Sequence, residues 1–228
     1  MNDISALLLR YQQQFHPVVP FDQRAEKIIL LDTTANNTEL SSGIVNDIGL
    51  FSSYINNKLS ANSARYAIGG YGEHRTIYSR SRVFDGEDEP RRFHLGLDIW
   101  GDEGTPVSAP LDAKVHSFAD NNQYGDYGAT IILKHELEGI IFYSLYGHLS
   151  LADLKVEIGM VLNRGTVFAH FGNPTENGCW PPHLHMQLIH DIGDHFGDYP
   201  GVCRYSERNI YLNNCPDPDL ICRLYRYV

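Results

Sequence analysis

The sequence predicts a mainly β protein, α+β overall, in which an antiparallel β-sandwich or open barrel carries a partly helical N-terminal extension. One observation is a succession of short apolar segments from about residue 93 onward, separated by clusters of glycine, asparagine and proline. Short segments at this spacing are typical of antiparallel sandwiches and barrels. The other observation is an apolar stripe before residue 60 with members three and four residues apart, which predicts an amphipathic helix.

The N-terminal extension is expected to span residues 1–67. A short buried strand is predicted over KIILLD (27–32), and a helix over the apolar stripe that follows it. The stripe consists of Ile44, Ile48, Phe51, Ile55 and Leu59. Because such a stripe is too apolar to remain in water, we expect the extension to pack on the neighbouring β domain.

The β domain is expected to span residues 68–228, including a C-terminal tail, and it opens with the glycine-rich join IGGYGEHR (68–75). The Gly70-x-Gly72 pair in this join is too short for a dinucleotide-binding fingerprint, and we interpret it as a turn. Six strands are then predicted. They are TPVSAP (105–110), AKVHSF (113–118), ATIILKH (129–135), IIFYSLYGHL (140–149), TVFAHFG (166–172) and HLHMQLIH (183–190).

Composition excludes several classes of partner. The formal net charge is −10 and no basic stripe occurs, which argues against binding to nucleic acid or to anionic lipid. No segment approaches the roughly 20 apolar residues that a membrane span needs. The apolar run Ala6–Leu9 is too short for a signal peptide, so the sequence predicts a cytoplasmic protein, or a periplasmic or secreted one if the sequence given lacks a leader.

The four cysteines do not predict a structural metal site. Cys179, Cys203, Cys215 and Cys222 have no C-x-x-C spacing, which argues against a zinc knuckle. We interpret them as small buried thiols that stay reduced in a cytosolic setting.

Costly polar side chains interrupt three apolar segments. His94 and Asp98 lie four apart in RFHLGLDIW, and His148 closes the strand that ends LYGHL. His183 and His185 lie two apart in a predicted strand, so their imidazoles project from the same face. An isolated H-x-H is also compatible with a pair of histidines on a wet strand face. The coincidence of five such groups instead favours a metal site.

The chemistry of zinc suggests how five groups divide. A catalytic zinc ion takes three protein ligands and keeps one position open for water, and further imidazoles beside it orient water or move protons. Two histidines and one carboxylate leave a positive charge that stabilises an oxyanion. No H-E-x-x-H or G-x-S-x-G motif occurs, and the acidic loop DIGDHFGDYPG (191–201) does not fit an EF-hand. We interpret the unpaired histidines as ordinary surface or core residues: His116, His135, His170, His190 and His195.

Four segments resemble a known family. HLGLD, GTPVSAPLDAKV, YGHLS and PHLHMQL occur in the order found in the lysostaphin-type (LytM-like) zinc metallopeptidases, and the resemblance covers roughly residues 68–190. Most of these enzymes are peptidoglycan endopeptidases. The resemblance implies a compact antiparallel β fold with an open groove across one zinc ion per chain. It implies that His94, Asp98 and His185 bind the zinc and that His148 and His183 are catalytic without binding it.

Two functional hypotheses follow from this resemblance. The first is a zinc endopeptidase that hydrolyses peptide bonds in peptidoglycan or in short peptides derived from it. The second is a non-catalytic, metal-binding accessory domain that binds a peptide or a partner enzyme. Familiar members of the family are exported, and neither residues 1–67 nor the tail NNCPDPDLICRLYRYV is a standard wall-targeting module. Since none of the five site residues is replaced, the sequence favours the enzyme.

Overall fold

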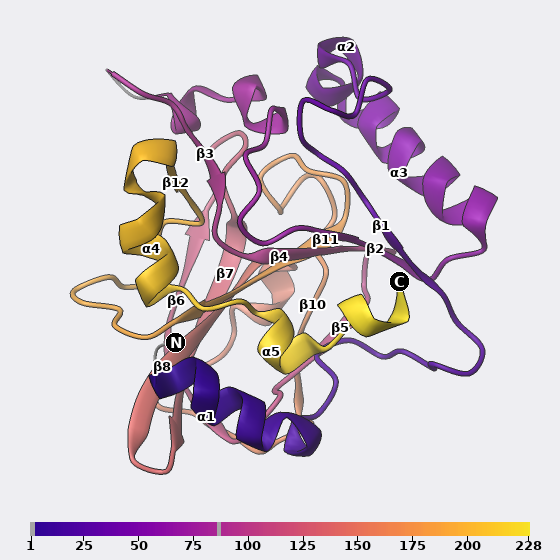
Figure 1. Cartoon of the computed structure of the whole chain (residues 1–228). Helices are drawn as coiled ribbons and strands as arrows, with labels where there is room; N and C mark the ends of the chain where they lie inside the picture. Colours follow the sequence, from indigo (N-terminus) through magenta and orange to yellow (C-terminus); the bar gives the residue numbers. More distant parts are fainter. Residues whose placement is uncertain (1–2, 86–87) are drawn as a thin grey trace.

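An eight-stranded sheet forms the centre of the fold in a computed structural model that describes residues 3–85 and 88–228 (Figure 1). In spatial order its strands are β1 (Ile28–Leu30), β2 (Tyr66–Gly69), β4 (Leu97–Trp100), β11 (His183–Ile189), β8 (Ile140–Leu149), β7 (Gly128–Leu137), β6 (Ala113–Asn121) and β9 (Val161–Leu162). Each neighbouring pair is antiparallel except β1 and β2, which run parallel.

Two small ribbons and several short helices surround the sheet. The ribbons are β5 (Pro106–Ser108) with β10 (Val167–His170), and β3 (Arg91–His94) with β12 (Val202–Arg204). The α-helices are α1 (Asp3–Tyr11), α2 (Ser42–Asn46), α3 (Ile48–Asn62), α4 (Arg208–Asn214) and α5 (Asp219–Cys222). The 3-10 helices are η1 (Gln12–Gln14), η2 (Ile77–Arg80), η3 (Arg82–Phe84), η4 (Leu151–Asp153), η5 (Tyr205–Glu207) and η6 (Tyr225–Tyr227).

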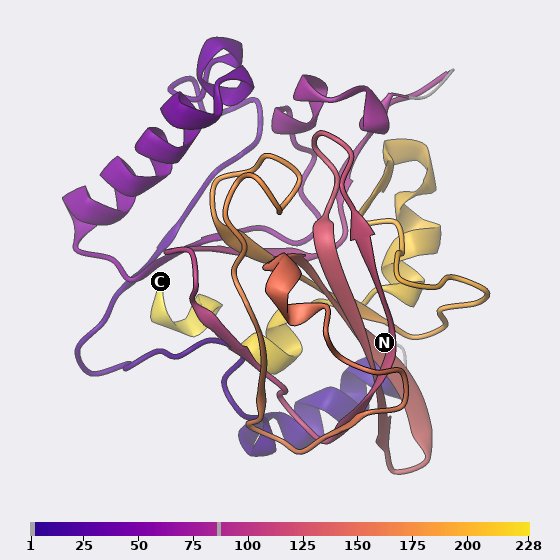
Figure 2. The same ribbon diagram turned by 180° about the vertical axis from the view of Figure 1, so that it is seen from behind.

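Both faces of the sheet are covered, because alternate side chains of a strand point in opposite directions. Ile131 and Leu133 of β7 join a core that includes residues of the β5–β10 ribbon, α1 and α5. Ile132, between them, belongs to a second cluster on the other face. Figures 1 and 2 show α1 and α5 side by side at one end of the molecule and α3 at the opposite side.

The mainly β class predicted from the sequence is confirmed, and each of the six predicted strands is present. KIILLD contains β1, but this strand lies at the sheet edge, so Leu30 is 57% exposed where a buried strand was expected. The Gly70-x-Gly72 join forms a turn, with Gly72 at φ +73°. The short helices α4 and α5 of the C-terminal tail were not predicted.

The apolar stripe lies on two helices instead of one. Asp47 ends α2, and its carboxylate then accepts a hydrogen bond from the backbone N–H of Leu50 (3.0 Å) at the start of α3. An aspartate satisfies a free N–H at a helix start better than it continues a helix, which explains the break. Phe51, Ile55 and Leu59 of α3 are buried as predicted, whereas Ile44 lies on α2.

Among residues 3–85 and 88–228, no helix combines the length and the apolar character needed to cross a bilayer.

Candidate metal centre and its cleft

Strand register brings the predicted site residues together. Asp98 of β4 pairs directly with His185 of β11, and two residues along His183 pairs with Trp100. His94 ends β3 and reaches the same place across the turn that leads into β4. The glycine of HLGLD is needed in this turn, because a Cβ on Gly96 would lie 2.4 Å from His185 Cε1.

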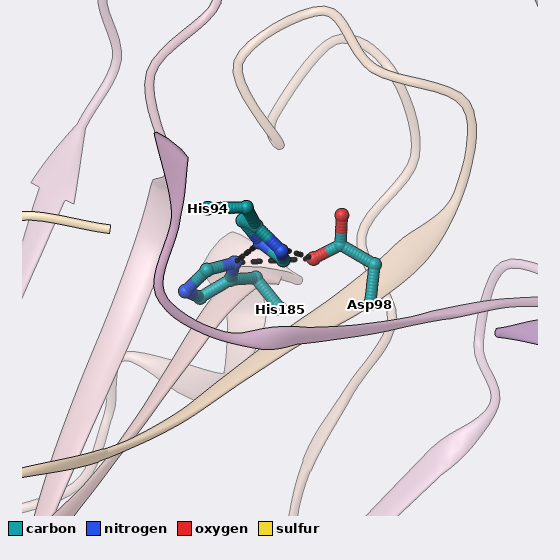
Figure 3. A group of neighbouring side chains, drawn as sticks. All are labelled: His94, Asp98 and His185. Atoms are coloured by element: carbon teal, nitrogen blue, oxygen red, sulfur yellow. Dashed lines mark hydrogen bonds and ion pairs between the residues drawn. The ribbon is translucent and has the colours of Figure 1, made fainter. Parts of the chain in front are cut away.

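Three donor atoms face one another at hydrogen-bonding distances (Figure 3). His94 Nε2 lies 3.0 Å from His185 Nδ1 and 3.3 Å from Asp98 Oδ1, and His185 Nδ1 lies 3.1 Å from that same oxygen. The three side chains are nearly inaccessible to solvent, with exposures of 0 to 3%. Two imidazole nitrogens and a carboxylate oxygen that converge in this way form a group suited to hold a metal ion.

The second polar atom of each proposed ligand side chain already has a hydrogen-bond partner. The Nδ1–H of His94 donates to the carbonyl of Gly70 (3.0 Å), and the Nε2–H of His185 donates to Gln187 Oε1 (3.2 Å). Asp98 Oδ2 accepts from the guanidinium of Arg75 (2.5 Å). These contacts fix the tautomer of each imidazole and leave one lone pair from each of the three residues for a cation. The residues present therefore fit the zinc ion that the sequence predicts.

His148 and His183 lie beside this group and point their second nitrogens elsewhere. The Nδ1–H of His148 donates to the carbonyl of Asn177 and that of His183 to the carbonyl of Pro181, each at 2.8 Å. Their rings are 4.1 Å apart between centroids, and His183 stacks on Trp100 at 3.9 Å. No hydrogen bond from residues 3–85 or 88–228 reaches the Nε2 of either ring, so no such partner fixes a proton there.

The backbone of His148 is unusual. It has φ +62°, a left-handed conformation that side chains other than glycine rarely adopt. Its N–H donates to the carbonyl of Tyr127 and its carbonyl accepts from Gly172, both at 2.8 Å, so neighbours on two sides hold this conformation. Strained backbone of this kind is concentrated at functional sites.

Burial keeps three imidazoles of the site neutral. It lowers the pKa of His94 and of His183 to about 4 and holds the pKa of His148 well below its usual value, where the neighbouring imidazoles of His183 and His185 add to the effect. Burial alone would raise the pKa of Asp98, but His94 and Arg75 outweigh it and keep the carboxyl ionised. At pH 7 the site thus offers the carboxylate of Asp98 and the uncharged imidazoles of His94, His148 and His183, the protonation states that metal binding and proton acceptance require.

A cleft opens over the site, and its walls include residues that the sequence analysis missed. Asp98, His148, His183 and His185 line it. Its walls are mainly aromatic and apolar: Tyr78, Phe84, Trp100, Tyr127, Trp180 and Val202. His195, interpreted above as an ordinary histidine, also lines the cleft, and its side chain is exposed.

The sequence analysis also missed two residues that contact the proposed ligands, Gln187 and Arg75. Gln187 follows His183 and His185 at the same spacing of two, so it shares their strand face and would have been found by extending the alternation. Arg75 carried no comparable signal, because its contact with Asp98 depends on the path of the chain through the glycine turn.

A single cation-binding group at the floor of a cleft, flanked by two uncharged imidazoles, is the kind of centre found in mononuclear metalloenzymes. Residues 92–196 match the model of Peptidase family M23. Over 97 residues the chain is 34% identical to an uncharacterized metalloprotease of Haemophilus influenzae, covering 42% of this chain and 18% of that protein. Over 97 residues it is 26% identical to Endolysin 2638A of Staphylococcus phage 2638A, covering 42% of this chain and 19% of that protein.

The matched region spans about a fifth of the length of these two relatives. Among solved structures, the catalytic domain of the antimicrobial peptidase lysostaphin from Staphylococcus simulans aligns with a TM-score of 0.40 at 21% identity, covering 70% of this chain and 96% of that chain. The match of residues 92–196 to this family model confirms the resemblance to the lysostaphin-type (LytM-like) peptidases that was seen in the motifs.

Proposed function

We propose that the protein is a zinc-dependent metallopeptidase that hydrolyses peptide bonds in peptidoglycan or in short peptides derived from it. The observation that carries the proposal is the convergence of His94 Nε2, Asp98 Oδ1 and His185 Nδ1 within 3.0–3.3 Å, beside two uncharged imidazoles in one cleft. One zinc ion per chain, held by these three residues, would supply Lewis acidity toward a substrate carbonyl and would acidify water.

The chain's own groups would handle the proton. His148 and His183 donate through Nδ1 to backbone carbonyls, so each presents Nε2 as the atom that accepts a proton from water or returns one to the leaving amine. Their lowered pKa values make them uncharged before the reaction. A proton gained by either ring during hydrolysis would be released readily to a departing amine, which is more basic.

The cleft accounts for the expected substrate class. It is lined mainly by aromatic and apolar side chains, and four of the five site residues lie in it, so an extended peptide would bring a carbonyl to the site most readily. Flexible peptides adopt this form more easily than folded proteins do. The names of the two matched relatives, a metalloprotease and an endolysin, agree with a peptidase and with a wall-derived substrate. No finding favours the alternative of a non-catalytic accessory domain.

A panel of purified muropeptides tests the proposal. Zinc-loaded protein should release defined fragments, read by mass spectrometry, and should leave folded proteins largely intact. Full-length protein with His148→Ala is the matched control, because it keeps the three proposed ligands. If zinc-loaded protein leaves the whole panel uncut but binds a peptide tightly, the accessory-domain hypothesis replaces this one. The cytoplasmic location stays a prediction, which fractionation of the native source would test.

A further inference from the structure

Within residues 3–85 and 88–228, Arg75 is the one charged side chain outside the predicted site that contacts a proposed metal ligand and is itself completely buried. Its exposed fraction is 0%, and its guanidinium donates to Asp98 Oδ2 at 2.5 Å. It lies outside residues 92–196, the segment that matches the family model. Burying an unpaired guanidinium costs free energy, so the partners of Arg75 indicate which role the side chain has.

Those partners tie the guanidinium in place from several sides. Besides Asp98, Nε donates to Glu73 Oε2 at 3.2 Å and Nη1 donates to the hydroxyl of Tyr78 at 3.2 Å. Glu73 keeps 28% of its side chain exposed, so the outer carboxylate faces water while the inner one faces the metal group. The planar fork of arginine suits such simultaneous contacts, which a lysine ammonium cannot reproduce.

The glycine turn makes room for this arrangement. Strand β2 pairs with β4 so that Gly69 lies opposite Asp98. A Cβ on Gly69 would lie 2.7 Å from Arg75 Nη2, and one on Gly70 would lie 2.2 Å from Glu73 Oε1. The absent side chains leave the space that the guanidinium and its outer carboxylate fill. The same turn also supplies the carbonyl of Gly70 that accepts from His94 Nδ1.

These contacts decide which oxygen of Asp98 is available. Because Arg75 occupies Oδ2, only Oδ1 is directed at His94 and His185. Groups that hold metal ligands from behind orient them and tune their basicity. We propose that Arg75 is a positioning residue of the metal centre, which holds Asp98 as a ligand through one oxygen, with the turn 69–75 as its support. The proposal rests on the metal-dependent function proposed above.

Zinc affinity of the full-length protein, measured by competition with a chromophoric chelator and without any peptide, tests the proposal. Arg75→Met should weaken zinc binding by about 10- to 100-fold, the usual range for partners that hold a ligand. Arg75→Lys should lie between this variant and the wild type, since an ammonium keeps the charge without the fork. The matched control is Arg80→Met. Arg80 follows closely in sequence, stacks over Trp180 and bonds to Tyr124, but touches none of the ligands, so its zinc affinity should be unchanged.

Two further readouts separate positioning from general stability. The absorption spectrum of the cobalt-substituted protein should change in the Arg75 variants and not in the control, because the spectrum reports the ligand set. Unfolding midpoints with and without zinc should show a smaller zinc-induced increase in the Arg75 variants. A residue with only a structural role would lower both midpoints equally and leave zinc affinity and the cobalt spectrum unchanged, which would overturn the proposal.

The outcome remains decisive if the Arg75 variants do not fold. Glu73→Gln removes the outer charge from a partly exposed side chain and should still weaken zinc binding severalfold, and unchanged affinity in that variant would refute the role of Arg75. A wild-type protein that binds no zinc would overturn the proposed function and this inference together. Tight wild-type binding with unaltered affinity in the folded Arg75 variants would overturn the inference alone.

Discussion

At the scale of single residues, the five site groups separate by which of their atoms the protein has already engaged. His94, Asp98 and His185 direct their free atoms at one point, whereas His148 and His183 each donate to a backbone carbonyl through Nδ1 and lie with their rings in tilted contact, 4.1 Å apart between centroids. The sequence alone could name these residues, because their spacing matches a family pattern. The family resemblance also implied how their roles divide, but the ring orientations behind that division could not be predicted from the sequence.

We therefore expect alanine substitutions to have two different outcomes. His148→Ala and His183→Ala should retain near-stoichiometric zinc and lose about a hundredfold or more in turnover, the usual scale for acid–base and oxyanion groups. His94→Ala should lose the metal. Metal content by atomic spectroscopy, together with turnover of a muropeptide, checks both, with exposed His190→Ala as the control. Loss of zinc from His183→Ala would show that the roles within the H-x-H pair are assigned wrongly.

A histidine away from the site provides a test of stability against pH. His135 is 1% exposed, hydrogen-bonded to Ser144 and to the carbonyl of Asp112, and burial lowers its pKa to about 4. In the unfolded chain its pKa is about 6.5. The unfolded state therefore binds the proton more tightly, and stability is lost as the pH falls from 6.5 toward 4.

The magnitude follows from the two pKa values. His135 should contribute up to about 1.4 kcal/mol of lost unfolding free energy for each pH unit in that window. We expect His135→Gln to be less stable than the wild type at pH 7 but to lose less stability between pH 7 and pH 4.5. Urea denaturation of both proteins at the two pH values measures the difference, in which the other histidines cancel. Parallel losses in the two proteins would contradict the prediction.

At the scale of elements, the strands could be predicted from the sequence, whereas the break between the two helices could not. Each of the six predicted strands exists because its apolar residues and turn signals are local properties of the sequence. The break at Asp47 and the edge position of β1 depend on competition with a cap and on the order of strands in the sheet. The turn at Gly70 was found, but its role in supporting Arg75 required the register between β2 and β4.

The loop that precedes β11 gives a prediction at this scale. Its Asn177 carbonyl holds His148, and the loop packs so closely on its neighbour that a Cβ on Gly178, at φ +81°, would lie 1.8 Å from the backbone oxygen of Asp126. Gly178→Ala should therefore displace the loop and release His148. We expect turnover to fall strongly while zinc affinity stays near the wild-type value, because no proposed ligand lies in the loop.

Gly159→Ala is the matched control. Gly159 has nearly the same backbone angle, φ +82°, but nothing lies within 4 Å of an added Cβ. This variant should lose only about 1 kcal/mol of stability from the unfavourable backbone conformation and should keep its turnover. Muropeptide turnover and thermal unfolding of both variants test whether the position of the loop controls His148. Equal turnover in the two would show that loop position does not control His148.

At the scale of the whole molecule, the N-terminal extension shares its packing with the site. Strands β1 and β2 continue the sheet next to β4, the strand that carries Asp98. Phe51 of α3 is fully buried and lies 5.8 Å from the ring of Trp100, which in turn stacks on His183. The two ends of the chain also meet, since Arg223 donates to the carbonyl of Gln12 at 3.0 Å. The proposed boundary at residue 67 falls inside β2.

This packing predicts that residues 1–63 and the β domain fold as one unit. A chain that begins at residue 64 would leave β2 as an exposed edge and would uncover Trp100 and Trp180, which are the only two tryptophans and share one cluster with Phe51, Ile55 and Leu59. We expect that fragment to be poorly soluble, with tryptophan emission shifted toward longer wavelength and no measurable zinc binding. In the full chain, Phe51→Ala should cost about 3–5 kcal/mol, the usual range for a buried phenylalanine, whereas exposed Leu50→Ala should cost less than about 0.5 kcal/mol. Limited proteolysis that releases a folded, zinc-binding fragment starting near residue 68 would show instead that the extension is a separate module.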